Sequence, residues 1–323
     1  MSKAIRIHTT GGPEVLKWEQ LPTPQPGPNE ALIHHEAVGL NYIDVYFRTG
    51  LYKAPLPCTI GMEGAGTVLA VGDNVSGLAP GDRVAYAGGP LGAYATERVI
   101  AADRLVKLPP EIDFKTAAAM MLQGITAHFL LHRTFKVQPG QNILLHAAAG
   151  GVGLIMCQWA KHIGANVIGV VSTEEKAALA KANGAAHTII GHATLAADVK
   201  RITGGAMVPV VYDSVGKDTF TTSLDCLAPL GVMVNYGNAS GPVPPFDVAT
   251  LGTKGSLYLT RPVFATYTAA RADLAASAAA LFAAVASGAV KIQVNQTYRL
   301  EDAAAAHAAL EARQTTGSTV LLP

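Results

Sequence analysis

A cluster of glycines near the middle of the chain has the spacing of a phosphate-binding turn. An apolar run ends at His146, three glycines follow within four positions, and a second apolar segment spans 154–160. This pattern predicts a strand, a tight turn and a helix. Backbone N–H groups in such a turn approach a phosphate that a side chain would otherwise block, and the helix N-terminus adds partial positive charge. The pattern therefore predicts a dinucleotide site, whose binding residues are Ala149, Gly150, Gly151, Val152 and Gly153.

The turn departs from the usual G-x-G-x-x-G pattern at one position, because Ala148 stands where the first glycine is expected. On this motif alone, a glycine-rich turn without a ligand is the alternative. A further apolar run at 166–171 begins about a dozen residues after the turn, as in a βαβ unit. This spacing favours the dinucleotide site.

Polar residues follow that second run, where NAD-binding folds usually carry an acidic residue for the ribose hydroxyls. Here the run is followed by Ser172 and Thr173, and Lys176 comes after two glutamates. Hydroxyl and ammonium groups suit a 2′-phosphate, and the glutamates are expected to lie in the first turn of a helix, where they complement its dipole. These residues favour NADPH over NADH.

The region up to about Lys115 consists of short strands separated by turns. Strands are expected at 31–38, 66–71 and 82–87, and four prolines between residues 21 and 28 exclude a helix there. This predicts a mostly β domain, a small barrel.

After Thr116 helical segments alternate with buried strands, which predicts an α/β fold with a doubly wound parallel sheet. Beyond Arg261 a long alanine-rich helix is expected at 269–287, and we expect the remaining tail to return to the first domain. The sheet strands are expected at 142–147, 166–172, 187–190, 208–213, 231–237 and 256–260, and the tail elements at 292–300, 301–313 and 318–322.

Composition excludes several classes of protein. A chain of 323 residues suggests about two domains, and a net charge of +1 gives no electrostatic case for nucleic acid or a membrane surface. The uncharged stretch at 274–290 is mostly alanine and too short for a membrane span, so it is expected to be a helix of a soluble domain. Three widely spaced cysteines and the absence of a signal-peptide pattern predict a cytoplasmic location.

Over nearly its whole length the chain resembles the medium-chain dehydrogenase/reductase superfamily, and within it the zinc-free quinone oxidoreductases. The resemblance implies a GroES-like catalytic domain at 1–123 completed by 262–323, a Rossmann domain at 124–261, and NADPH held in a cleft between them. The matching segments are 39–44, 61–66, 81–84, 146–153 and 212–216.

The zinc-dependent members carry a cysteine ligand where this chain has Asn41 and a histidine where it has Met62. Amide and thioether groups are poor zinc ligands, and a catalytic zinc needs three good protein ligands. We therefore expect no metal, and an acceptor that is already electrophilic, such as a quinone.

The resemblance also implies roles for individual residues. Asn41 and Asp44 would contact the cofactor, Asn41 would also reach the substrate, and Tyr46 and Tyr52 would line the quinone pocket. The alternative is that Asn41 caps a short helix ending at Gly50, with Asp44 in its first turn, and that the tyrosines are packing aromatics. The other cofactor-binding residues implied are Thr126, Ser214 and Asn238, with Arg313 joining Lys176 on the 2′-phosphate. A tyrosine expected in that pocket falls near Gly191, so one ligand is missing.

The predicted function is that of an NADPH-dependent quinone oxidoreductase that transfers hydride directly to the quinone. One alternative is an NADPH-dependent reductase of enones, enals or enoyl thioesters. An alternative of another class is a non-catalytic NADPH-binding protein with a structural or RNA-binding role. The resemblance further implies a homodimer joined through the Rossmann sheet edge, around Ser256–Arg261, where an exposed edge strand needs a partner.

Overall fold

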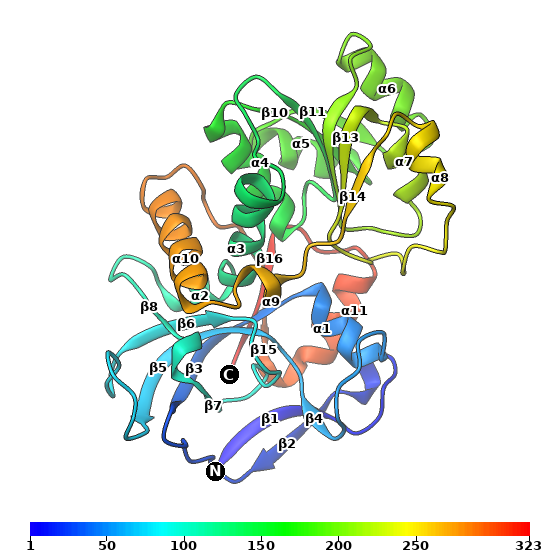
Figure 1. The fold of residues 1–323 in the computed structure, drawn as a ribbon. Helices are drawn as coiled ribbons and strands as arrows, with labels where there is room; N and C mark the ends of the chain where they lie inside the picture. Colours follow the sequence, from blue (N-terminus) through cyan, green and yellow to red (C-terminus); the bar gives the residue numbers. More distant parts are fainter. The chain divides into compact units, whose positions relative to one another are not determined.

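The computed structural model describes all residues, 1–323, and divides into two compact units (Figure 1). Unit 1 contains Met1–Ile125, Thr268–Phe282 and Ile292–Pro323. Unit 2 contains Thr126–Tyr267 and Ala283–Lys291. Helices α3 (Met121–Phe129) and α10 (Arg271–Ala286) each contribute residues to both units.

Unit 1 is built on two mainly antiparallel sheets, as its frequent turns predict. The larger sheet has the order β15-β16-β3-β5-β6-β8, with β7 also paired to β3, and the smaller has the order β2-β1-β4. The last strand, β16, pairs antiparallel with β3, so the end of the chain lies in the same sheet as the first region. The strands are β1 (Ser2–Ile7), β2 (Lys17–Leu21), β3 (Glu30–Leu40), β4 (Cys58–Thr59), β5 (Glu63–Val71), β6 (Arg83–Ala87), β7 (Glu97–Ala101), β8 (Val106–Lys107), β15 (Val294–Arg299) and β16 (Ser318–Leu322).

Alternating side chains of these strands form the core of unit 1. Ile33, Val68 and Tyr86 lie at its centre, and Leu300 and Ala306 pack on it from the C-terminal segment. Burial of this apolar surface is the main stabilising term for such sheets. The helices of this unit are α1 (Tyr42–Thr49), α2 (Phe114–Ala118) and α11 (Ala303–Glu311), with short 3-10 turns at Pro13–Val15, Ala102–Arg104 and Leu300–Asp302.

Unit 2 is a six-stranded, entirely parallel sheet in the order β11-β10-β9-β12-β13-β14. The predicted doubly wound sheet is therefore confirmed. Every predicted strand is present, β12 with the predicted bounds and the others with one or both ends shifted. The start of β13 differs most from the prediction, at Leu227 instead of residue 231. The strands are β9 (Asn142–His146), β10 (Asn166–Val171), β11 (Ala185–Ile190), β12 (Val208–Asp213), β13 (Leu227–Asn235) and β14 (Tyr258–Thr260).

The helices of unit 2 connect these strands in the right order for repeated βαβ units. Between the sheet and the helices lies a core that includes Leu144, Ile168, Val211 and Met233. No helix of the chain is both long enough and apolar enough to span a bilayer. The helices are α4 (Gly151–Ile163), α5 (Glu174–Ala182), α6 (Leu195–Ile202), α7 (Phe220–Leu224), α8 (Ala249–Thr253) and α9 (Phe264–Tyr267), with a π-helical turn at Leu130–Thr134.

Candidate active site

The glycine turn joins the carboxyl end of β9 to α4. Gly150 is the N-cap residue of α4, and no side chain caps this helix end. The turn is tight: Ala147 has a φ of 52°, and a Cβ added at Gly153 would lie only 2.3 Å from the carbonyl oxygen of Ala147. The first N–H groups of a 13-residue helix are thus left for a ligand, which is the arrangement that favours a phosphate.

Two further loops at the same edge of the sheet are packed backbone to backbone. A Cβ at Gly237 would lie 2.4 Å from the carbonyl oxygen of Ser214, so only glycine permits this approach. The buried Asp213 carboxylate shapes the first loop by accepting hydrogen bonds from the N–H groups of Val215, at 2.7 Å, and Gly216, at 3.1 Å. Ser214 and Asn238, both predicted to bind the cofactor, therefore lie on adjacent loops.

His146 ends β9 and is fully buried. Its Nε2 lies 2.9 Å from the Ser223 hydroxyl, while its Nδ1 has no partner. Burial lowers the pKa of His146 to about 4, so the ring is neutral at physiological pH.

The residues predicted to bind the 2′-phosphate follow β10. Thr173 is the N-cap residue of α5, and its hydroxyl accepts a hydrogen bond from the Lys176 backbone N–H at 3.3 Å. Ser172 and Thr173 are exposed, and Glu174 and Glu175 lie in the first turn of α5, as predicted. The cluster is therefore accessible to a ligand, and its binding role stays a prediction.

In unit 1, Asn41 is held by two neighbours that sequence reasoning did not select. Its Nδ2 donates to Glu63 Oε2 at 2.6 Å, and its Oδ1 accepts from Gln123 Nε2 at 3.2 Å. Glu63 also accepts the Leu122 backbone N–H at 2.8 Å, near the start of α3. Burial raises the pKa of Glu63 to about 8, although these donors act to lower it. The one signal in the sequence is that Glu63 lies in segment 61–66, which carries the family resemblance.

Asp44 is fully buried, and its contacts are structural. Its Oδ2 accepts the Asn41 backbone N–H at 2.9 Å, which places both residues at the start of α1 in the capping arrangement that the alternative predicted. The same oxygen accepts the Tyr94 hydroxyl at 3.1 Å, while Oδ1 has no partner. Burial raises the pKa of Asp44 to about 7. A direct contact between Asp44 and a cofactor stays a prediction.

A chain of buried polar groups continues from Asp44 to the surface of unit 1. Arg48 can only donate, so its contact at 3.3 Å leaves His307 Nδ1 as acceptor and puts the ring hydrogen on Nε2. Nε2 then donates to the Tyr94 oxygen at 3.0 Å, and the Tyr94 hydroxyl donates to Asp44. Arg48 in turn forms a two-pronged ion pair with Glu311, both N···O distances being 2.7 Å. These hydrogen bonds and the ion pair link α11 to α1 and continue through Asp44 to Asn41.

The three tyrosines of α1 and the following loop form one aromatic cluster. Ring centroids are 5.6 Å apart for Tyr42 and Tyr46, which share one face of α1, and 5.2 Å apart for Tyr46 and Tyr52. Tyr46 is 7% exposed, so it has a packing role as well as any role with a ligand.

The remaining predicted residues are distributed over both units. Thr126 lies on α3 and is 9% exposed, and it belongs to unit 2. Arg313 belongs to unit 1 and follows α11 with a φ of 60°, an uncommon backbone conformation for a residue with a side chain. Unit 1 thus carries Asn41, Asp44, Tyr46, Tyr52 and Arg313, and unit 2 carries Thr126, residues 149–153, Ser172, Thr173, Lys176, Ser214 and Asn238.

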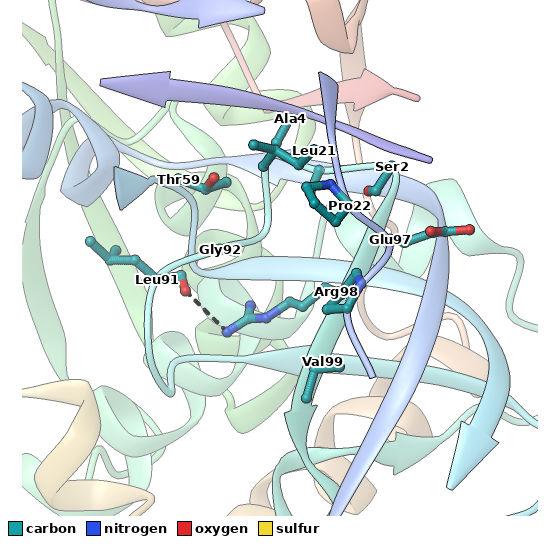
Figure 2. A pocket seen from close by; sticks show the side chains of 12 residues that line it. Ser2, Ala4, Leu21, Pro22, Thr59, Leu91, Gly92, Glu97, Arg98 and Val99 are labelled. Carbon is teal, nitrogen blue, oxygen red and sulfur yellow. Dashed lines mark hydrogen bonds between the residues drawn. The ribbon is translucent and has the colours of Figure 1, made fainter. Parts of the chain in front are cut away.

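A small pocket of about 220 Å³ in unit 1 contains none of these residues (Figure 2). The Arg98 guanidinium borders it and donates to the carbonyl oxygens of Pro90, at 2.5 Å, and Leu91, at 3.4 Å. It also lies 4.7 Å from the centre of the Tyr86 ring. These contacts fix the guanidinium, although its Nη1 is buried without a hydrogen-bond partner.

The chain contains no group of three or more His, Cys, Asp or Glu side chains that could hold a metal ion. His128 and His132, which have the spacing of a metal-binding pair, instead pack around Trp159, with ring centroids 5.7 and 5.6 Å from it. These two histidines therefore have a packing role.

Two family models match the chain. The alcohol dehydrogenase GroES-like domain matches residues 27–110, and the zinc-binding dehydrogenase domain matches residues 151–284. The second description names zinc, and its match does not include Asn41 or Met62, where the resemblance implies the ligands of the zinc-dependent members.

Known proteins resemble the chain over its full length. A quinone oxidoreductase of Pseudomonas aeruginosa is 52% identical, with all of both chains covered. A 2-haloacrylate reductase of a Burkholderia species is 45% identical, covering 100% of this chain and 99% of the relative. The crystal structure of Escherichia coli quinone oxidoreductase complexed with NADPH has a TM-score of 0.97 at 46% identity, covering 99% of this chain and all of that one. The chain therefore belongs to the quinone oxidoreductase family of the medium-chain dehydrogenase/reductase superfamily.

Proposed function

We propose that the protein is an NADPH-dependent quinone oxidoreductase that works without a metal. The observation that carries the proposal is the start of α4, where a glycine turn leaves the helix N-terminus without a side-chain cap. The relative whose structure contains NADPH supports the choice of cofactor. The tight turn at Gly153 fits a pyrophosphate, because it brings backbone and no side chain to the ligand.

On the cofactor side, each group in unit 2 has a distinct task. Residues 149–153 would bind the pyrophosphate, and Ser214, Asn238 and Thr126 would contact the nicotinamide half. Ser172, Thr173 and Lys176 would bind the 2′-phosphate together with Arg313 of unit 1. The exposed hydroxyl groups and the lack of an acidic residue at Ser172 support NADPH over NADH.

On the acceptor side, the bound nicotinamide supplies the hydride, and the protein positions the quinone and excludes water. Asn41 keeps one N–H of its amide for a ligand, because Glu63 takes the other. The hydroxyls of Tyr46 and Tyr52 are suited to donate hydrogen bonds to a quinone oxygen as it gains negative charge. A hydroquinone anion is delocalised, so this step does not need a Lewis acid.

Reduction of an activated alkene is the second candidate. It is favoured by the 45% identical 2-haloacrylate reductase, because a 2-haloacrylate is a conjugated acid whose double bond accepts hydride. The same direct transfer then forms a carbon–hydrogen bond, and a proton from solvent completes the reduction.

The deciding experiment is anaerobic oxidation of NADPH and NADH, followed by nicotinamide absorbance. The acceptors are 1,4-benzoquinone, 9,10-phenanthrenequinone, an enal, 2-chloroacrylate and a crotonyl thioester. Quinone turnover with a clear preference for NADPH supports the proposal. Rapid reduction of an alkene without quinone turnover moves the assignment to the second candidate, and binding without any turnover favours a non-catalytic role.

We also propose the domain division 1–123 with 262–323, and 124–261, a cytoplasmic location, and a homodimer joined along β14. Tyr258 and Val263, 61% and 52% exposed, lie on or just after this edge strand, and such apolar exposure supports a partner there. Sedimentation of the purified protein as a monomer at micromolar concentration contradicts the dimer.

A further inference from the structure

Arg261 lies just after β14 and holds the loop that follows β13. Its Nη1 donates to the Asn235 carbonyl oxygen at 3.1 Å, to Asn235 Oδ1 at 2.7 Å and to the Gly237 carbonyl oxygen at 3.0 Å. In the amide orientation that satisfies its neighbours, Asn238 accepts from Arg261 Nη2 at 3.2 Å and donates to the Gly237 carbonyl oxygen at 2.9 Å. One guanidinium thus contacts three of the four residues from Asn235 to Asn238.

All of these acceptors are neutral oxygens, so this set of contacts is not an ion pair. A guanidinium suits the arrangement because it is planar, carries five N–H groups and cannot act as an acceptor. A lysine retains the charge, but its single ammonium nitrogen cannot replace the two guanidinium nitrogens, Nη1 and Nη2, that donate to different residues of the loop. The contacts therefore depend on the shape of the arginine head and not only on its charge.

The loop lies on one particular side of the predicted cofactor site. In the sheet order, β10 with the predicted 2′-phosphate residues is on one side of β9, and β12 and β13 are on the other. Dinucleotides lie across the carboxyl ends of such a sheet, with one half on each side of the glycine turn. If the 2′-phosphate lies at β10, the nicotinamide half extends toward β12 and β13, where loop 235–238 lies.

We infer that Arg261 is a positioning residue, which holds loop 235–238 in the shape that receives the nicotinamide half of NADPH. The inference rests on the proposed function and goes beyond it, because Arg261 acts through the loop and through Asn238.

The neighbouring contacts are independent of Arg261, so its loss has a local effect. Tyr236 N–H donates to the Asp213 carbonyl oxygen at 2.8 Å, and Ala239 N–H donates to the Ser214 carbonyl oxygen at 3.1 Å. These bonds keep both ends of the loop on the sheet when the guanidinium is removed. We therefore expect Arg261→Met to fold.

The test compares two ligands that differ in the half that reaches the loop. NADPH contains both halves, whereas 2′,5′-ADP contains only the adenosine half with its 2′-phosphate. Isothermal titration measures both dissociation constants for the wild type, Arg261→Met and Arg261→Lys. The control is Arg201→Met on α6, which removes an exposed cation of the same unit that bonds only Asp198.

Arg261→Met is expected to raise the dissociation constant of NADPH about tenfold, the equivalent of one or two hydrogen bonds, and to change that of 2′,5′-ADP less than about twofold. Arg261→Lys is expected to raise the dissociation constant of NADPH by at least about threefold, again with less effect on 2′,5′-ADP. Arg201→Met is expected to affect the binding of neither ligand selectively. Because Arg261→Lys keeps the charge, it separates positioning from long-range attraction.

Three results overturn the inference. The first is unchanged NADPH affinity in both Arg261 variants. The second is an equal rise in the dissociation constants of NADPH and 2′,5′-ADP, which indicates general damage to the fold or loss of electrostatic attraction. The third is full recovery of NADPH binding in Arg261→Lys. If the wild type binds neither ligand, the proposed function itself fails, and that outcome is distinct because it appears before any variant is made.

Discussion

Replacing Gly153 by alanine tests the glycine turn most directly, because the structure defines the clash. The added Cβ would lie 2.3 Å from the Ala147 carbonyl oxygen, 2.7 Å from the Ala148 carbonyl carbon and 2.8 Å from its Cα. Real Cβ atoms essentially never come within 3.0 Å of such atoms, and all three belong to the backbone. No side-chain rotation can relieve the contact, so the turn itself must move by about 0.7 Å or more.

The expected cost has two parts. Overpacking of this kind destabilises by about 1–3 kcal/mol, which lowers the melting temperature by about 2–4 °C for each kcal/mol. A displaced turn also loses hydrogen bonds to a charged phosphate, each worth about 1.5–3 kcal/mol, so the dissociation constant of NADPH should rise about 10- to 100-fold.

The assay is calorimetric titration with NADPH, together with thermal unfolding with and without the cofactor. Gly252→Ala on α8 is the matched control, because a Cβ there meets nothing within 4 Å. It should be neutral or stabilise by about 0.5–1 kcal/mol. If Gly153→Ala binds NADPH within about threefold of the wild type, the turn does not hold the pyrophosphate and the reasoning is refuted.

Three further outcomes are expected. Above about pH 8, where the Glu63 carboxyl is ionised, Glu63→Gln presents an amide donor to either the Asn41 amide or the Leu122 N–H and should destabilise the protein by about 1–3 kcal/mol in urea unfolding; unchanged stability contradicts the described hydrogen bonds. Tyr94→Phe removes the only side-chain hydroxyl that donates a hydrogen bond to Asp44, and it should lower the free energy of unfolding by about 1–3 kcal/mol. Because that hydrogen bond lowers the pKa of Asp44, its loss should move the near-neutral titration of the carboxyl, followed by NMR, to higher pH. Burial lowers the pKa of His307 to about 3, so the unfolded chain binds a proton between about pH 3 and 6.5 that the folded chain does not. Stability should therefore fall as the pH drops through that window, by about 1.4 kcal/mol per pH unit from this residue, and His307→Gln should reduce the slope by that amount.

Local patterns in the sequence are sufficient to predict the architecture of both units. The run ending at His146, the glycines and the segment 154–160 are contiguous, so their periodicity alone predicts β9, the turn and α4. Buried parallel strands are apolar on both faces, which makes β10 and β12 visible in the sequence. Tyr42 and Tyr46 share a face because helical spacing requires it.

Only the tertiary structure decides which distant groups share a hydrogen bond. Glu63 occupies an ordinary strand position, and nothing local shows that the register of the sheet brings it to Asn41. The contact of Tyr94 with His307 joins residues 213 positions apart, and that of Arg261 with Asn235 joins β14 to β13. Such pairs depend on the relative placement of whole elements, which sequence periodicity does not encode. The sequence by itself therefore determines where the site residues lie along the chain, and the tertiary structure decides what holds them in place.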